Sequence, residues 1–142
     1  MSEAFIEYMS GYKYQLAKDY KIATSIKPKE NIDTQFIALD KQGNLTVKSG
    51  YAWDGTSGPV VDTEHNLRAS LVHDAFYQLM RRKHLEASKH KDKADKLFRK
   101  MCKEDGVPST VAQVYYEALK LLGKPASAPS HAKKIKRAPE AE

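Results

Sequence analysis

The sequence contains a single cysteine, Cys102, and no long hydrophobic run. One cysteine excludes an intramolecular disulfide, which suits a reducing compartment. No window of about eighteen apolar residues is present, so we expect no membrane-spanning helix. The N-terminus is acidic and amphipathic and lacks a charged start followed by an apolar run, so we expect no export signal.

Several motifs of known chemistry are also missing. The sequence has no phosphate-binding P-loop, no dinucleotide fingerprint and no G-x-S-x-G elbow, which argues against nucleotide enzymes and serine hydrolases. Zinc is not favoured either, because no spacing brings a second imidazole beside His73. The other histidines are His65, His84, His90 and His131.

The positive charge is uneven. The net charge is +6, and lysine and arginine are concentrated in residues 81–104 and 124–142. Two interpretations stay open. These residues form either a solvated helix face and a soluble tail or a surface for phosphate, as nucleic acid or lipid headgroups.

The length suits one modest core, and we predict one domain over residues 1–123 followed by a basic flexible tail over 124–142. Apolar and polar residues alternate at 12–16, 36–39 and 45–47, which predicts a small antiparallel sheet. Gln42, Gly43 and Asn44 predict a hairpin turn between the last two segments. Residues 27–33 are expected to form a loop.

Helical periodicity dominates the second half. It predicts a first helix that follows a cap at Asp62 or Thr63 and runs to about Arg82, a second over 86–104 and a third from 109 or 110 to Gly123. The connector between the first two is short, so they should pack as antiparallel neighbours. The expected fold is therefore α+β, with a small antiparallel sheet, then a helical hairpin and a third helix.

A glycine-rich segment, residues 50–59, joins the two halves. Glycine permits positive φ and close backbone approach, so this segment could turn carbonyls or amides toward a ligand. It could equally be a tight strand-to-helix corner whose tryptophan fills the core. Its members of interest are Trp53, Asp54, Gly55 and Gly58.

Arg68 falls on the apolar face of the first helix. An unpaired charge there would be costly, so we expect a carboxylate to hold it, most plausibly Asp54 or Asp62. A role in fixing the loop is favoured over a role in catalysis.

The adjacent residues His73 and Asp74 lie on the first helix, and Asp95 lies on the second. His73 and Asp95 are equally distant from His84 at the centre of the hairpin and equally offset from the apolar stripes of their helices, which predicts a hydrogen bond between them. A carboxylate on one ring nitrogen makes the other a better general base. The alternative is a structural histidine with its partner. Tyr77, one turn later, would line the pocket or pack in the core.

Two resemblances follow from these blocks. The segments G-Y-A-W-D-G-T-S-G-P, R-A-S-L-V-H-D-A-F-Y-Q-L-M and A-D-K-L-F resemble a family of small phage and bacterial proteins called domain of unknown function 1353, over residues 11–123. The family implies a viral or prophage source, hence a host bacterial cytoplasm or a virion, and supplies no reaction.

The second resemblance is local. The glycine loop, H-D-x-x-Y and A-D-x-x-F are similar to the calcium-dependent phospholipases A(2), above all the compact form in capsids of small animal viruses. This resemblance implies that His73 activates water, that Asp95 orients the His73 side chain and that Asp74 binds calcium with carbonyls of the loop. Asp54, the acid of the glycine-rich segment, is a further candidate ligand. Trp53, Gly55, Gly58, Arg68 and Tyr77 are the candidate binding residues.

Two functions are therefore expected as alternatives. One is a metal-assisted hydrolase of phage origin, dependent on a divalent cation such as calcium and acting on a phospholipid or another ester. The other is a non-catalytic phage accessory or virion protein whose basic surface binds nucleic acid or phage structural proteins.

Overall fold

A computed structural model describes residues 13–56, 60 and 62–127 of the chain. The predicted fold class is confirmed: antiparallel sheets precede three helices, and the first two helices pack together. Of the predicted features, Gly58 and residues 128–142 of the expected tail lie outside the described residues.

Short antiparallel strands make up the first half of the described chain. β1 pairs with β6, and a four-stranded sheet has the order β2-β5-β4-β3. The strands are β1 (Tyr14–Gln15), β2 (Tyr20–Ala23), β3 (Ile32–Asp33), β4 (Ile37–Leu39), β5 (Asn44–Val47) and β6 (Ala52–Trp53).

The predicted hairpin is confirmed as β4 and β5. Asp40 closes its turn, because Oδ1 accepts hydrogen bonds from the backbone N–H of Gln42 and Asn44, both at 2.9 Å. Gly43 has φ +91°, and a Cβ atom there would lie 2.2 Å from the carbonyl oxygen of Thr24, so this position requires glycine. The alternation of the strands then directs one face of the sheet into the core.

Three strands were not predicted. β2 pairs along its whole length with β5, β3 lies inside the predicted loop 27–33, and β6 lies inside the glycine-rich segment. β3 and β6 have two residues each and are too short to show a period of two, whereas the four residues of β2 do alternate, so that signal was available. A two-residue strand exists because a neighbouring backbone supplies its hydrogen bonds, which a local pattern does not reveal.

The helices are α1 (Leu67–Arg81), α2 (Ala87–Glu104) and α3 (Ser109–Ser127). α1 starts later than predicted, and its N-cap residue is Asn66. The residues before it form a turn in which Thr63 donates its backbone N–H to Oδ1 of Asn66 at 2.9 Å. α3 continues past the predicted stop at Gly123, since a single glycine costs a helix only about 1 kcal/mol.

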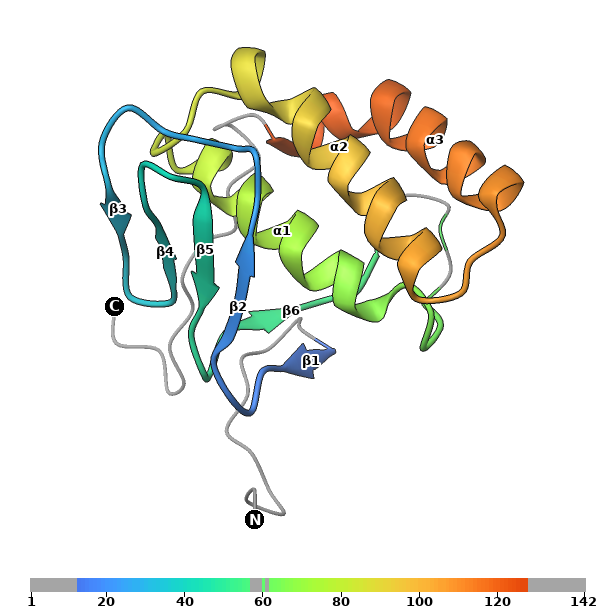
Figure 1. Cartoon of the computed structure of the whole chain (residues 1–142), viewed down its shortest axis with the longest axis horizontal. Coiled ribbons are helices and arrows are strands. Elements are labelled where there is room, and N and C mark those ends of the chain that lie inside the picture. Colours follow the sequence, from blue (N-terminus) through green and yellow to red (C-terminus); the bar gives the residue numbers. More distant parts are fainter. Residues whose placement is uncertain (1–12, 57–59, 61, 128–142) are drawn as a thin grey trace, which may run out of the picture.

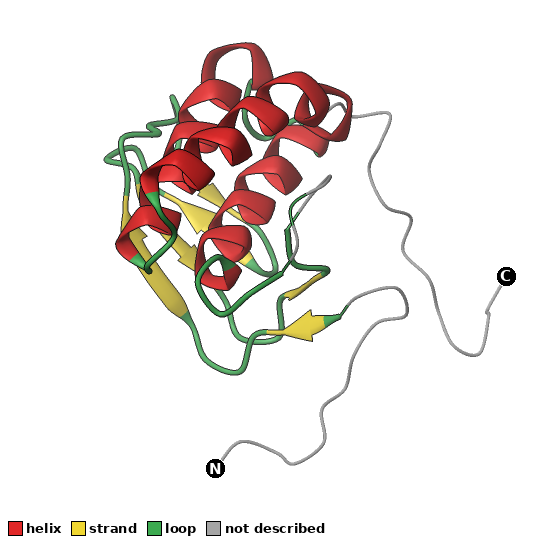
Figure 2. Cartoon of the chain, turned by 90° about the vertical axis from the view of Figure 1, so that its right-hand side faces the viewer, coloured by secondary structure: helices red, strands yellow, loops and turns green. Residues whose placement is uncertain are grey.

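The helices and the four-stranded sheet form two layers, with the sheet on one side of α1 and α2 (Figures 1 and 2). β6, which is part of the glycine-rich segment, passes beside α1 (Figure 1). The buried core joins both layers: Ile37, Leu39, Leu45 and Val47 from the sheet meet residues of α1 and α2 such as Phe76. Cys102 belongs to this core, and burial raises the pKa of its thiol to about 12, as expected for an inert cysteine.

The predicted partners of Arg68 were wrong. Its guanidinium donates a bidentate pair of hydrogen bonds to the carboxylate of Asp105, each at 2.9 Å, and another hydrogen bond to Glu104 at 3.1 Å. These contacts raise the pKa of Arg68, Asp105 contributing most. Arg68 therefore connects the start of α1 to the end of α2. Asp62 instead accepts hydrogen bonds from Thr56.

We expect a double-mutant cycle to identify the partner. Arg68→Ala combined with Asp105→Ala should show a coupling of about 1 kcal/mol, because the paired groups are partly exposed and solvent screens them. The control cycle, Arg68→Ala with Asp62→Ala, should be additive. Urea unfolding measures both, and coupling to Asp62 alone would contradict this assignment.

Candidate functional site

His73 and Asp95 meet as the sequence predicts. Nε2 of His73 lies 2.7 Å from Oδ1 of Asp95, between α1 and α2. The two helices are joined by five residues, so positions equally far from the connector lie at the same height. The spacing argument therefore found a real contact between residues 22 positions apart.

Asp95 has two further donors. The hydroxyl of Tyr77 donates to the same oxygen, Oδ1, at 2.6 Å, and the ammonium of Lys91 contacts Oδ2 at 2.7 Å. Lys91 also donates to the backbone oxygen of Leu119 in α3, at 3.2 Å. We refer to His73, Tyr77, Lys91 and Asp95 as the Asp95 network.

The protonation states within the Asp95 network follow from these contacts. Burial by itself would raise the pKa of Asp95, but hydrogen bonds from His73, Lys91 and Tyr77 hold this pKa below its usual value. Burial and the neighbouring carboxylate raise the pKa of Tyr77, so its phenol stays protonated and donates. Asp95 is consequently an anion at neutral pH, although it lies in the interior.

The pair is deeply buried. His73 is 4% exposed and Asp95 is 0% exposed. The imidazole packs on the ring of Tyr77, with 4.1 Å between the ring centroids, and on Phe98 at 5.3 Å. Since Nε2 faces Asp95, Nδ1 is the nitrogen left for a reacting molecule. Only a small part of the residue is open to solvent, so a reacting molecule has little of the ring to approach.

Asp74 projects away from the Asp95 network, as predicted from its position one residue along the helix. The hydroxyl of Tyr51 donates to its Oδ2 at 2.5 Å, and the guanidinium of Arg81 lies 3.9 Å from Oδ1. Its side chain is 25% exposed. Tyr51 thus connects the glycine-rich segment to the residue that follows His73.

Other described residues of the glycine-rich segment also contact neighbouring groups. Trp53 is buried and donates its indole N–H to Ser70 of α1 at 2.9 Å, which supports the interpretation as a core-filling corner. Gly55 has φ +94°, and a Cβ atom there would lie 2.3 Å from Oδ2 of Asp62. Asp54, a candidate metal ligand, is partly exposed. The pKa of Lys13 is raised mainly by its hydrogen bond to Asp62, and the charge of Asp54 adds a smaller contribution.

A cation site is not complete in these residues. In the described ranges, no group of three or more histidine, cysteine, aspartate or glutamate side chains is arranged to hold a metal. Calcium takes six to eight oxygen ligands. At Asp74 the described side chains supply one carboxylate, so the other ligands would have to be backbone oxygens and water.

Sequence reasoning missed two members of the site. Lys91 stands four residues before Asp95, the spacing at which a lysine and an aspartate meet on a helix surface, so this signal was available. Tyr51 had no such signal, because its contact with Asp74 spans 23 residues and depends on where β6 passes α1. Tyr77 was predicted, but with a role in lining or packing rather than as a donor to Asp95.

The comparison with known families agrees with the sequence blocks. Residues 31–119 match the model of a protein family of unknown function, DUF1353. The chain belongs to the DUF1353 family. The matched range includes the described residues of the glycine-rich segment and the whole Asp95 network. No curated protein and no solved structure matches significantly. Among the described residues, no helix is long and apolar enough to cross a membrane.

We expect Lys91 to stabilise the fold far more than a neighbouring lysine. Lys91→Met leaves the buried Asp95 without its cation and should lower the free energy of unfolding by about 3 kcal/mol. The matched control is Lys96→Met on the same helix, because Lys96 pairs at 3.2 Å with Asp92 and both side chains are 55% exposed. That change should cost less than about 0.5 kcal/mol. Equal losses in urea unfolding would contradict a special role for Lys91.

The pKa of Asp95 also predicts a dependence of stability on pH. A carboxylate whose pKa is lowered by folding stabilises the protein above the unfolded value of about 3.9, and this contribution disappears as the pH falls. The difference in unfolding free energy between wild type and Asp95→Asn should therefore shrink from about pH 5 to about pH 2. Glu64→Gln, at a side chain that is 86% exposed, provides the control. A difference that stays constant with pH would refute the prediction.

Proposed function

We propose that this DUF1353 protein is a hydrolase in which His73 acts as a general base on water. The observation that carries this proposal is the 2.7 Å contact between Nε2 of His73 and an ionised, buried carboxylate. A carboxylate on one ring nitrogen fixes the tautomer, so the other nitrogen presents its lone pair. The resemblance to phospholipases A(2) favours an ester, such as a phospholipid, as the substrate.

The proposed reaction uses His73 twice. Nδ1 takes a proton from water while the water oxygen bonds to the ester carbonyl carbon, and the carbonyl oxygen becomes an oxyanion. The imidazolium then gives that proton to the alkoxide as the carbon–oxygen bond to the leaving group breaks. Asp95 stabilises the imidazolium, and Tyr77 and Lys91 hold Asp95 in position.

The burial of His73 defines what substrate binding must achieve. With 4% of the residue exposed, little of His73 is open to solvent. Binding of an apolar chain would have to bring the ester carbonyl to the ring, and movement of neighbouring groups would widen this access and exclude bulk water from the reaction. We infer that activity depends on how the substrate is presented, for example as vesicles rather than as dispersed monomers.

Asp74 is the residue that would hold a divalent cation in this proposal, with backbone oxygens of the glycine-rich segment. When bound, such a cation would supply positive charge for the oxyanion. Tyr51, which donates to Asp74 at 2.5 Å, would fix the orientation of the carboxylate. The support for a cation is the resemblance together with the placement of Asp74 beside this segment.

We expect His73→Gln and Asp95→Asn each to lower the hydrolysis rate by about a hundredfold or more, as for loss of a general base or its orienting partner. Release of fatty acid from phospholipid vesicles and of the chromophore from aryl esters measures the rate, with and without calcium. Asp74→Asn should remove any dependence on calcium.

His84→Gln is the matched control, because His84 is exposed in the connector between α1 and α2. It should keep the parental rate. Thermal unfolding of each variant shows whether a lost rate reflects a lost fold. A folded His73→Gln protein with the parental rate would refute the hydrolase proposal and leave the Asp95 network a purely structural role.

A further inference from the structure

Two hollows lie one after the other where α2 faces the segment between β2 and β3. Each encloses about 310 Å³. The first lies at the start of α2 and the second near its middle. Six lysines line them, two from the segment and four from α2: Lys27, Lys29, Lys89, Lys93, Lys96 and Lys100. We call this surface the basic groove.

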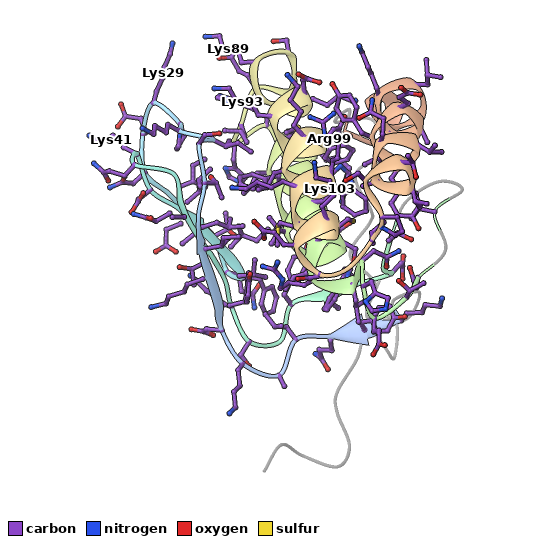
Figure 3. All side chains as sticks on the ribbon, turned by 45° about the vertical axis from the view of Figure 1, so that its right-hand side comes forward. Lys29, Lys41, Lys89, Lys93, Arg99 and Lys103 are labelled. Carbon is purple, nitrogen blue, oxygen red and sulfur yellow. The ribbon has the colours of Figure 1, made fainter. Side chains whose placement is uncertain are left out.

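The four lysines of α2 form a row. They are spaced by four, three and four residues, so they share one face of the helix, and the row extends over about 16 Å. Figure 3 shows Lys29 and Lys89 at the same end of the molecule, with Lys93 following along α2. Positive charge therefore follows the groove over its length.

This charge is only partly neutralised. Glu30 and Glu86 are the acids that line the hollows, and Glu86 pairs with Lys89 at 3.3 Å. Within the described part of the chain, Lys93 and Lys100 form no ion pair, and both are exposed. These two cations of the second hollow are therefore available to an anionic ligand.

The lining favours a polyanion that is recognised by its phosphates. Neither hollow is lined by phenylalanine, tyrosine or tryptophan, and the rings that line the first hollow are the imidazoles of His84 and His90, so large stacking platforms for bases are lacking there. A row of about 16 Å is long enough to contact several phosphates of one strand. A membrane surface is less suited, because the large apolar side chains that are exposed in the described residues, Val111, Val114 and Leu121, belong to α3.

We propose that the basic groove binds the sugar–phosphate backbone of nucleic acid without sequence preference. The lysines contribute through release of counterions from the phosphates, so affinity falls steeply with salt. The segment between β2 and β3 forms the opposite wall and aligns the strand with α2. Binding does not require the Asp95 network and is independent of hydrolysis.

The test uses the full chain and labelled DNA of mixed sequence in fluorescence anisotropy over a range of salt concentrations. Lys93→Gln/Lys100→Gln should weaken binding by about tenfold and lower the slope of log affinity against log salt by about two. The matched control is Lys18→Gln/Lys120→Gln, which removes the same charge from exposed positions outside the groove. It should change affinity less than about threefold, with a smaller change in slope.

Three outcomes would overturn the proposal. Equal losses for the two double variants would show that only net charge matters. A strong preference for one sequence would show that the bases are read. Binding to phosphatidylserine vesicles without binding to DNA would assign the groove to lipid headgroups. Both double variants leave the buried core unchanged, and thermal unfolding confirms that they fold.

Discussion

The carboxylate of Asp95 is the constraint on which the helical layer depends. A charge with no solvent exposure is tolerated only if donors surround it, and here they come from two helices: His73 and Tyr77 from α1, and Lys91 from α2. Lys91 also reaches the backbone of α3 at Leu119. All three helices must therefore keep their relative positions for Asp95 to remain satisfied.

The Asp95 network meets different demands in the proposed chemistry and in the structure. A general base needs a fixed tautomer and a negative charge behind the ring, and the contact of His73 with the ionised Asp95 supplies the charge and favours one tautomer. Lys91 works against the second requirement, because a cation on Oδ2 weakens the pull of Asp95 on the imidazolium. If the pair is purely structural, Lys91 only stabilises the buried carboxylate of Asp95, and there is no reaction for it to slow. The two roles of His73 therefore differ in one requirement: a general base must bring Nδ1 into contact with the substrate's water, and a structural histidine need not.

The sequence predicted the parts of this protein that depend on rigid local geometry. The contact between His73 and Asp95 followed from helix spacing because the connector is short and helices are nearly straight rods. The prediction for Arg68 was wrong because its partner was sought nearby in the sequence. The antiparallel hairpin instead brings the start of α1 beside Asp105 at the end of α2. The contact of Tyr51 with Asp74 was out of reach, because a two-residue strand such as β6 has no periodic pattern and its path depends on the whole fold.

α2 carries both proposed sites, and its amphipathic character separates them. Asp95 and the apolar residues of this helix are buried against α1 and α3, whereas Lys93, Lys96 and Lys100 face the segment between β2 and β3. Lys91 is the exception, because it turns inward to neutralise Asp95. A change at Lys91 therefore acts on the stability of the helical layer, and a change at Lys93 or Lys100 acts on the charge of the groove. Because these effects have different origins, variants at Lys91 and variants at Lys93 or Lys100 test the two proposals separately.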